Sequence, residues 1–138
     1  MIKAKELCIG DLVKYNSKVY EVEEIDGKSN TIIVKSDTDE IYNTKNLIIC
    51  DDLEPIEITP EMLLKNGWTE MNGGNIYWLE LPHYQSLTYY YNLPNEIVSY
   101  NDIIDRKVEI KKHLHYIHKL QQLLRALDVD EKYINMII

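Results

Sequence analysis

The sequence predicts a protein of the α+β class, and three observations lead to this prediction. Residues 10–58 alternate short β-branched runs with turn-forming residues, and residues 75–110 contain further strand-like runs. Helix signals mark residues 59–67 and 112–127. We therefore expect an N-terminal β-meander, a short helix, a second antiparallel sheet, and a long C-terminal amphipathic helix packed on that second sheet.

The first meander is predicted from its turns. Gly10-Asp11, Asn16-Ser17 and the run "DGKSN" are turn chemistry, and the residues between them are rich in Val, Ile and Tyr. Four or five short strands joined by tight turns indicate a small barrel or a strongly curled sheet. This meander opens on "GDLVKY", closes near "LEPIEI", and resembles an SH3-like barrel. The expected strands are "LVKY", "KVYEVEEI", "TIIVK", "IY" and "NLIIC".

A short helix is predicted over residues 59–67, with both of its ends marked. Thr59 is placed to cap the helix, Pro60 fits the first helical position, and Gly67 suits the position just past the last turn. Trp68 follows directly, and we expect it to anchor the helix against the sheet.

Four runs predict the second sheet: "NIYWLEL", "QSLTYYYNL", "EIVSY" and "KVEI". The chain contains 11 Tyr and no Phe. We therefore expect Tyr77, Trp78, Tyr89 and Tyr91 to serve more as core than as a binding surface. Residues 128–138 form either a second short helix or an extended tail, and their apolar ending "MII" should dock on the protein.

Length and charge limit the possible partners. The 138 residues can form a core that needs no metal or disulfide, as a lobe over 1–58 and a lobe over 59–138 packed together as one compact unit. The net charge is −8, yet residues 106–138 carry more basic than acidic side chains. Such a protein is poorly suited to wrap nucleic acid over its whole surface, although it could present a local basic strip.

The chain carries no sign of export or of membrane insertion. Its N-terminus lacks the apolar core of a signal peptide, and no apolar run is long enough for a membrane span. Cys8 and Cys50 share no motif spacing with each other or with histidine, so we expect free buried thiols. These features predict a cytoplasmic protein without a membrane partner.

Three of the four histidines lie within the run "KKHLHYIHKL". On a helix, with about 100° per residue, His115 points away from the apolar sector, His118 lies nearer its border, and His113 lies opposite His115. The three imidazoles therefore cannot meet at one metal, and a zinc site would need further ligands from elsewhere. We expect this cluster to be a solvated or half-buried polar face.

Basic residues are dense over residues 106–119. Lys111 and Lys112 sit where the helix is expected to begin, and the positive end of the helix dipole disfavours cations there. Arg106 and Lys107 precede them. Two explanations are open: the segment pairs with the protein's own acidic surface, or it binds an external anionic partner.

The sequence lacks the common catalytic motifs. It has no glycine-rich phosphate loop, no Gly-x-Ser-x-Gly elbow, no Cys–His pairing at a recognisable spacing, and no calcium loop. Asp51-Asp52 and the pair Asp37 and Asp39 are expected in solvated turns. We therefore expect no catalytic residue, no metal and no cofactor.

Three stretches carry a resemblance to a known group of proteins: "KAKELCIGDLVKYNSKVYEVEEI", "LEPIEITPEMLLKNGW" and "YIHKLQQLLRAL". With its Tyr-x-His-x-Leu-Gln-x-Leu helix pattern, the chain resembles an uncharacterised family of small proteins from phages and mobile elements of gut bacteria. The resemblance implies such a setting and singles out His118 and Gln121, either as a buried hydrogen-bonded pair or as a ligand contact. A glycine is expected soon after the helix in this family, and Val129 stands there instead, which puts a left-handed helix stop in doubt.

These observations favour a small non-enzymatic accessory protein that binds another protein. Binding of a nucleic-acid enzyme by imitating the charge of DNA is one form that this could take. The alternative is nucleic-acid binding through residues 106–119, and a metal-dependent enzyme comes third. The binding residues that we expect are His115, His118, Gln121, Arg106, Lys107, Lys111 and Lys112.

Overall fold

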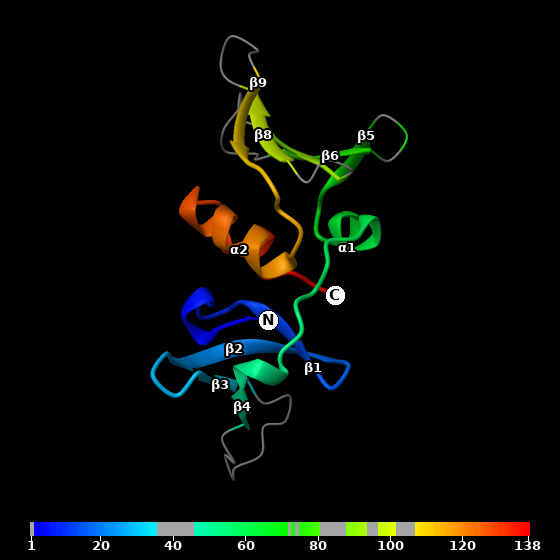
Figure 1. Cartoon of the computed structure of the whole chain (residues 1–138). Helices are drawn as coiled ribbons and strands as arrows, with labels where there is room; N and C mark the ends of the chain where they lie inside the picture. Colours follow the sequence, from blue (N-terminus) through cyan, green and yellow to red (C-terminus); the bar gives the residue numbers. More distant parts are fainter. Residues whose placement is uncertain are drawn as a thin grey trace. The chain divides into compact units, whose positions relative to one another are not determined.

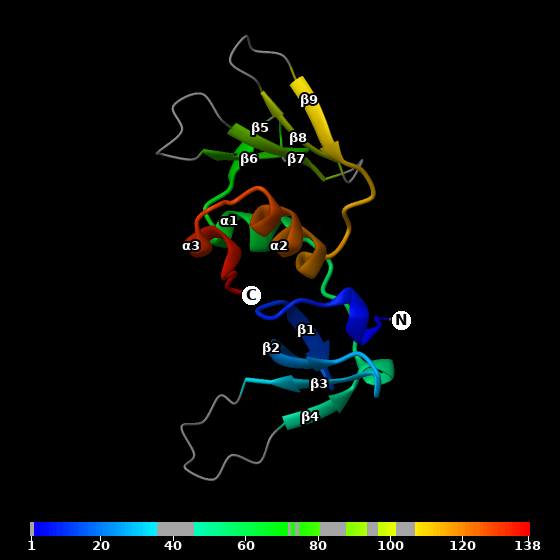
Figure 2. The same cartoon turned by 90° about the vertical axis from the view of Figure 1, so that its left-hand side faces the viewer.

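The computed structural model describes residues 2–35, 46–71, 73, 75–80, 88–93, 97–101 and 107–138. The chain is of mixed α+β type, with two antiparallel sheets, as predicted (Figures 1 and 2). Its contacts divide it into two compact units. Unit 1 comprises Met1–Glu57 and Tyr116–Asp130, and unit 2 comprises Ile58–His115 and Glu131–Ile138.

Unit 1 is built on a four-stranded sheet in the order β1-β2-β3-β4. Its elements are η1 (Ala4–Glu6), β1 (Leu12–Tyr15), β2 (Lys18–Asp26), β3 (Thr31–Val34), β4 (Asn46–Ile49), η2 (Cys50–Asp52) and α2 (Ile117–Ala126). Reciprocal backbone hydrogen bonds of 3.0 and 2.8 Å between Lys14 and Glu54 extend the pairing beyond β1. The meander is thus a sheet of at least four strands, while its likeness to an SH3-like barrel stays a prediction. The expected strand "IY" lies outside the described residues.

Local chemistry explains the first hairpin and the core beneath it. Asn16 and Ser17 have φ values of 47° and 65°, and they form the predicted two-residue turn between Tyr15 and Lys18. Positive φ at both central residues matches the twist of the strands that the turn joins. Alternate residues of all four strands then enter the core of unit 1: Val13, Val22, Ile32, Val34 and Ile48.

Unit 2 holds a five-stranded antiparallel sheet in the order β5-β6-β7-β8-β9. Its elements are α1 (Pro60–Lys65), β5 (Thr69–Met71), β6 (Ile76–Glu80), β7 (Thr88–Asn92), β8 (Ile97–Asn101), β9 (Lys107–Lys111) and α3 (Glu131–Ile134). Tyr77 and Tyr91 face each other across β6 and β7, and both are buried. The prediction that these tyrosines form core is confirmed for this pair. The side chain of Tyr89 lies outside the described part of the structure.

The ends of α1 are those expected from the sequence. The N–H of Met62 donates to the Thr59 Oγ1 atom at 3.3 Å, and Pro60 occupies the first turn. Gly67 has a φ of 89°, and the N–H of Trp68 donates to the carbonyl of Leu63 at 3.0 Å. This is the left-handed helix stop for which glycine is favoured. Trp68 is buried, as expected.

The C-terminal residues dock within unit 2. The Asn66 side chain accepts from the N–H of Ile137 at 2.7 Å and donates to its carbonyl at 2.8 Å. Met136 is buried, whereas Ile137 is exposed. The apolar ending is therefore held, as predicted, and α3 precedes it.

The position of the long C-terminal helix differs from the prediction in two respects. α2 begins at Ile117, not near residue 112, because His113 is left-handed with a φ of 57° and Tyr116 is extended. In addition, the predicted lobe over 59–138 included this helix and placed it on the second sheet. Residues 116–130 instead group with unit 1.

The end of α2 resolves the question of the helix stop. Asp128 has a φ of 57°, its N–H donates to the carbonyl of Arg125 at 3.0 Å, and the N–H of Val129 donates to that of Leu124 at 3.0 Å. This pair of bonds is the Schellman arrangement. A left-handed stop is present, supplied by Asp128 one position before Val129, and aspartate is one of the few residue types that tolerate this conformation.

Candidate functional site

A buried polar cluster ties α2 to the segment that leads into β1. The Asp11 side chain is 0% exposed, and its Oδ2 atom accepts from the N–H of Cys8 at 2.8 Å and from Gln122 Nε2 at 2.6 Å. Its Oδ1 atom pairs with Arg125 Nη1 at 2.5 Å. Bonds to an ionised acceptor are stronger than neutral ones, and they offset the loss of hydration of this carboxylate. Because three donors hold it, Asp11 acts as a structural anchor.

Gln121 lies next to this anchor and is also fully buried. Its Oε1 atom accepts from the N–H of Leu12 at 2.9 Å, and its Nε2 atom donates to the carbonyl of Gly10 at 3.2 Å. The side-chain amide of Gln121 therefore pairs with one backbone N–H and one backbone carbonyl at the start of β1, as the peptide group of a neighbouring strand would. Gly10 has a φ of 90°, and a Cβ atom there would lie 3.1 Å from Arg125 Nη2, so the approach of the helix depends on glycine.

His118 is only 2% exposed, so the solvated or half-buried face expected of the histidine cluster is wrong at this position, whereas the burial implied by the resemblance is confirmed. Its ring stacks on Tyr116 with centroids 5.9 Å apart, and its Nδ1 atom has no hydrogen-bond partner among the described residues. Burial lowers the pKa of His118 below its ordinary value. Asp11 and Glu6 oppose this shift, and Lys119 adds to it. The Nδ1 atom thus takes no part in the expected His–Gln pair.

The other predicted binding residues do not join this cluster. Lys111 ends β9 and Lys112 follows it; both are exposed, and Lys112 Nζ lies 3.4 Å from Glu109 Oε1. Neither residue begins a helix, so the expected conflict with the helix dipole does not exist. His115 is half-buried before α2, and its carbonyl accepts from the N–H of Ile58 at 3.0 Å. Arg106 and the side chain of Lys107 lie outside the described residues.

The potential metal ligands and the two cysteines of the described part of the chain are not grouped. No group of three or more His, Cys, Asp or Glu side chains within it could hold a metal ion. Cys50 is a buried free thiol, as predicted, and this burial raises its pKa. Cys8 is also free, but it is exposed, so the prediction that it is buried is wrong. No helix within the same residues is long and apolar enough to cross a membrane.

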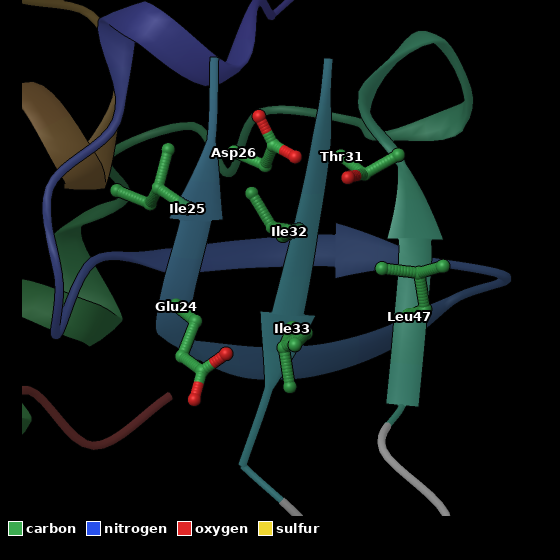
Figure 3. Close-up of a pocket in the computed structure, with 7 residues that line it drawn as sticks. All are labelled: Glu24, Ile25, Asp26, Thr31, Ile32, Ile33 and Leu47. Carbon is green, nitrogen blue, oxygen red and sulfur yellow. The ribbon is translucent and has the colours of Figure 1, made fainter. Parts of the chain in front are cut away.

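The outer face of the sheet in unit 1 carries an unusual arrangement of side chains. The register places Glu24, Ile33 and Leu47 in one row across β2, β3 and β4. Asp26, Thr31 and Ile49 form the next row. Figure 3 shows all of these residues except Ile49, around a hollow on this face. We call Ile33, Leu47 and Ile49 the apolar patch, and Glu24 and Asp26 the acidic column.

The apolar patch is open to solvent at the edge of the sheet. Leu47 is 63% exposed and Ile49 is 53% exposed, and β4 is the last strand in the order of the sheet. Leu47 also lines a second hollow together with Tyr15 and Tyr20. Contiguous exposed apolar side chains next to charged ones are typical of interaction sites.

This surface was not predicted from the sequence, although the sequence contains a signal for it. A strand with one wet face alternates apolar and polar residues. The run "NLIIC" shows apolar residues without alternation, so both faces of β4 are apolar. Such a run can also mark a strand buried on both sides, and only the structure distinguishes the two cases.

Comparisons of the chain with protein-family models, with curated proteins and with solved structures gave no significant match.

Proposed function

We propose that the protein is a non-enzymatic binding protein that contacts another protein through the apolar patch. The observation that carries this proposal is the exposure of Leu47 and Ile49 side by side on an edge strand, beside Ile33. Covering apolar surface yields about 25 cal/mol for each Å² removed from water, so a partner that covers this patch gains free energy. A phage or mobile-element setting, implied by the resemblance of three stretches of the sequence, belongs to the same proposal.

The described polar residues give a negative argument for the same function. The buried acid Asp11 is held by three donors. The Nδ1 atom of the buried His118 has no hydrogen-bond partner among the described residues, so no acid–base pair forms there. General acid–base catalysis needs groups within hydrogen-bond reach of a substrate. The cluster instead supports a role in fixing α2, which leaves the outer face of the sheet as the better candidate.

Nucleic-acid binding through Lys111 and Lys112 has weaker support. Lys112 already pairs with Glu109, and this acid lies on the same strand as Lys111. A phosphate-binding surface should present several cations without an interleaved acid. Binding to DNA or RNA that falls steeply with salt and is lost in Lys111→Glu/Lys112→Glu would revive this alternative.

The test is a selection of binders from a random peptide display library on the full-length protein. Selected peptides should lose binding to Leu47→Lys/Ile49→Lys by at least about tenfold, measured by fluorescence anisotropy. The matched control is Leu64→Lys, which changes a 48% exposed leucine on α1, and it should bind as the wild type does. The proposed function is contradicted if the peptides bind Leu47→Lys/Ile49→Lys as tightly as the wild type. It is also contradicted if they lose as much affinity for the Leu64→Lys control.

A further inference from the structure

The acidic column gives the outer face of unit 1 a charge that the apolar patch alone does not explain. Glu24 and Asp26 are both exposed, and no cation among the described residues forms an ion pair with either. Asp26 accepts hydrogen bonds from the turn that follows, chiefly from Ser29, and these bonds hold the pKa of its carboxyl below the ordinary value. Asp26 therefore stays negatively charged to a lower pH than an ordinary aspartate does.

We propose that the partner docks on this face as an amphipathic helix, with its apolar side on the apolar patch and with Lys or Arg residues along one flank that pair with the acidic column. This inference rests on the proposed function and specifies the chemistry of the partner. A partner with an acidic flank would be repelled, because like charges that face each other across an interface are unfavourable.

The spacing of the side chains favours a helix over an extended strand. Strands lie about 4.8 Å apart, so the acidic column on β2 and the outer residues of the patch on β4 are separated by about 10 Å. An extended segment is too narrow to present two parallel rows at this distance, because all its side chains on one side lie in a single line. A helix with its side chains is about 10–12 Å across and can do so.

The spacing along the strands agrees with the same geometry. Leu47 and Ile49 are two residues apart on β4, as Glu24 and Asp26 are on β2, which corresponds to about 6.7 Å. On a helix, residues i and i+4 share a face and are separated by a rise of about 6 Å. A helix that runs along the strands can therefore match both pairs with one apolar i, i+4 pair and one basic i, i+4 pair.

The experiment uses a display library of 18-residue amphipathic helices with a fixed leucine stripe and flank positions randomised among Lys, Arg, Glu, Gln and Ser. Selection on the full-length wild-type protein should enrich Lys and Arg at the flank at least about fivefold over Glu. Selection on Glu24→Lys/Asp26→Lys should reverse this preference. The control Glu61→Lys/Glu70→Lys makes the same change in net charge at two exposed acids of unit 2, and it should retain the wild-type preference.

The outcomes separate this inference from the proposed function. Helices that depend on Leu47 but show no basic flank preference, or whose preference is unmoved by the reversal of the acidic column, overturn the helix inference and leave the proposed function standing. An equal shift in the control variant overturns the inference as well, because it reports overall charge. If the peptides from the random library bind Leu47→Lys/Ile49→Lys as tightly as the wild type, the proposed function itself is overturned, and the helix inference falls with it. Thermal unfolding of each variant verifies that it is folded.

Discussion

Asp11 and His118 show two ways in which unit 1 accommodates a buried polar side chain. Asp11 is held by three donors, two of which are side chains of α2. His118 Nδ1 has no partner in the part of the chain that the structure describes, and burial of the ring favours the neutral imidazole. The stability of the protein should therefore respond to pH through the histidine.

We expect the free energy of unfolding to fall as the pH drops below about 6.5. The pKa of His118 is lowered by burial in the folded protein and returns to its ordinary value on unfolding. Between these two values the unfolded chain binds more protons, so acidification favours it, and the effect levels off below the folded pKa. Urea unfolding at a series of pH values, in the wild type and in His118→Leu, measures this slope.

The variant His118→Leu should flatten the pH dependence in this window. His113→Leu changes an exposed histidine and serves as the control, whose slope should match that of the wild type. An unchanged slope in His118→Leu would assign the pH dependence to other groups.

At the level of residues, some of these features could be predicted from the sequence and others could not. The resemblance singled out His118 and Gln121, and both are buried. Asp11 was expected in a turn, because Gly-Asp is a common turn pair. Its partners Gln122 and Arg125 are more than 110 positions away, and no local pattern can indicate a contact at that separation.

Among the elements, α2 depends on the backbone of one strand for its placement. Gln121 satisfies the N–H of Leu12 and the carbonyl of Gly10. Gln121→Leu keeps a side chain of similar size but leaves both backbone groups without their hydrogen-bond partner. We expect a loss of about 1–3 kcal/mol in the free energy of unfolding, measured by urea denaturation.

Hydrogen exchange locates the effect of this substitution. The amide of Leu12 should exchange faster in Gln121→Leu than the loss of global stability requires. The amide of Val22, which donates to the carbonyl of Asp11 at 2.9 Å, should follow the global loss alone. Ala126→Gln, at an exposed position of the same helix, is the control. Equal acceleration at both amides would mean that Gln121 does not hold α2 on β1.

The elements themselves were predictable where their signals are local. Turn residues marked the hairpin at Asn16, and capping residues marked α1. The start of α2 was placed too early because apolar spacing continues back to Leu114, which is buried although it precedes the helix. The lysines at 111 and 112, unfavourable at a helix start, were the available sign of this error.

On the scale of the whole molecule, unit 1 combines two distant parts of the chain. The predicted lobe over 1–58 did not include α2, whereas residues 116–130 group with residues 1–57 in the structure. A fragment of residues 1–58 therefore lacks Gln122 and Arg125, two of the three donors that hold Asp11. Hydrogen bonds to a charged group are worth about 1.5–3 kcal/mol each, so the fragment loses a substantial part of its stability.

We therefore expect fragment 1–58 to show no cooperative urea transition by circular dichroism. Adding a peptide of residues 116–130 should restore one, and the same peptide with Gln121→Leu/Arg125→Leu should not. A cooperative transition of the fragment alone would show that the first sheet is stable without the helix.

The assignment of the helix to a unit was beyond the reach of the sequence. An amphipathic helix reveals that one side is covered, but either sheet offers an apolar face that could cover it. The deciding contacts are the polar ones of Gln121, Gln122 and Arg125, and each joins residues more than 100 positions apart.

The split of unit 1 between the two ends of the chain also has a consequence for biosynthesis. Residues 58–115 must leave the ribosome after the first sheet and before α2. At translation rates of about 5–20 residues per second, the nascent strands wait about 3–12 seconds for their helix. During this interval chaperones can reach a surface that the finished protein hides.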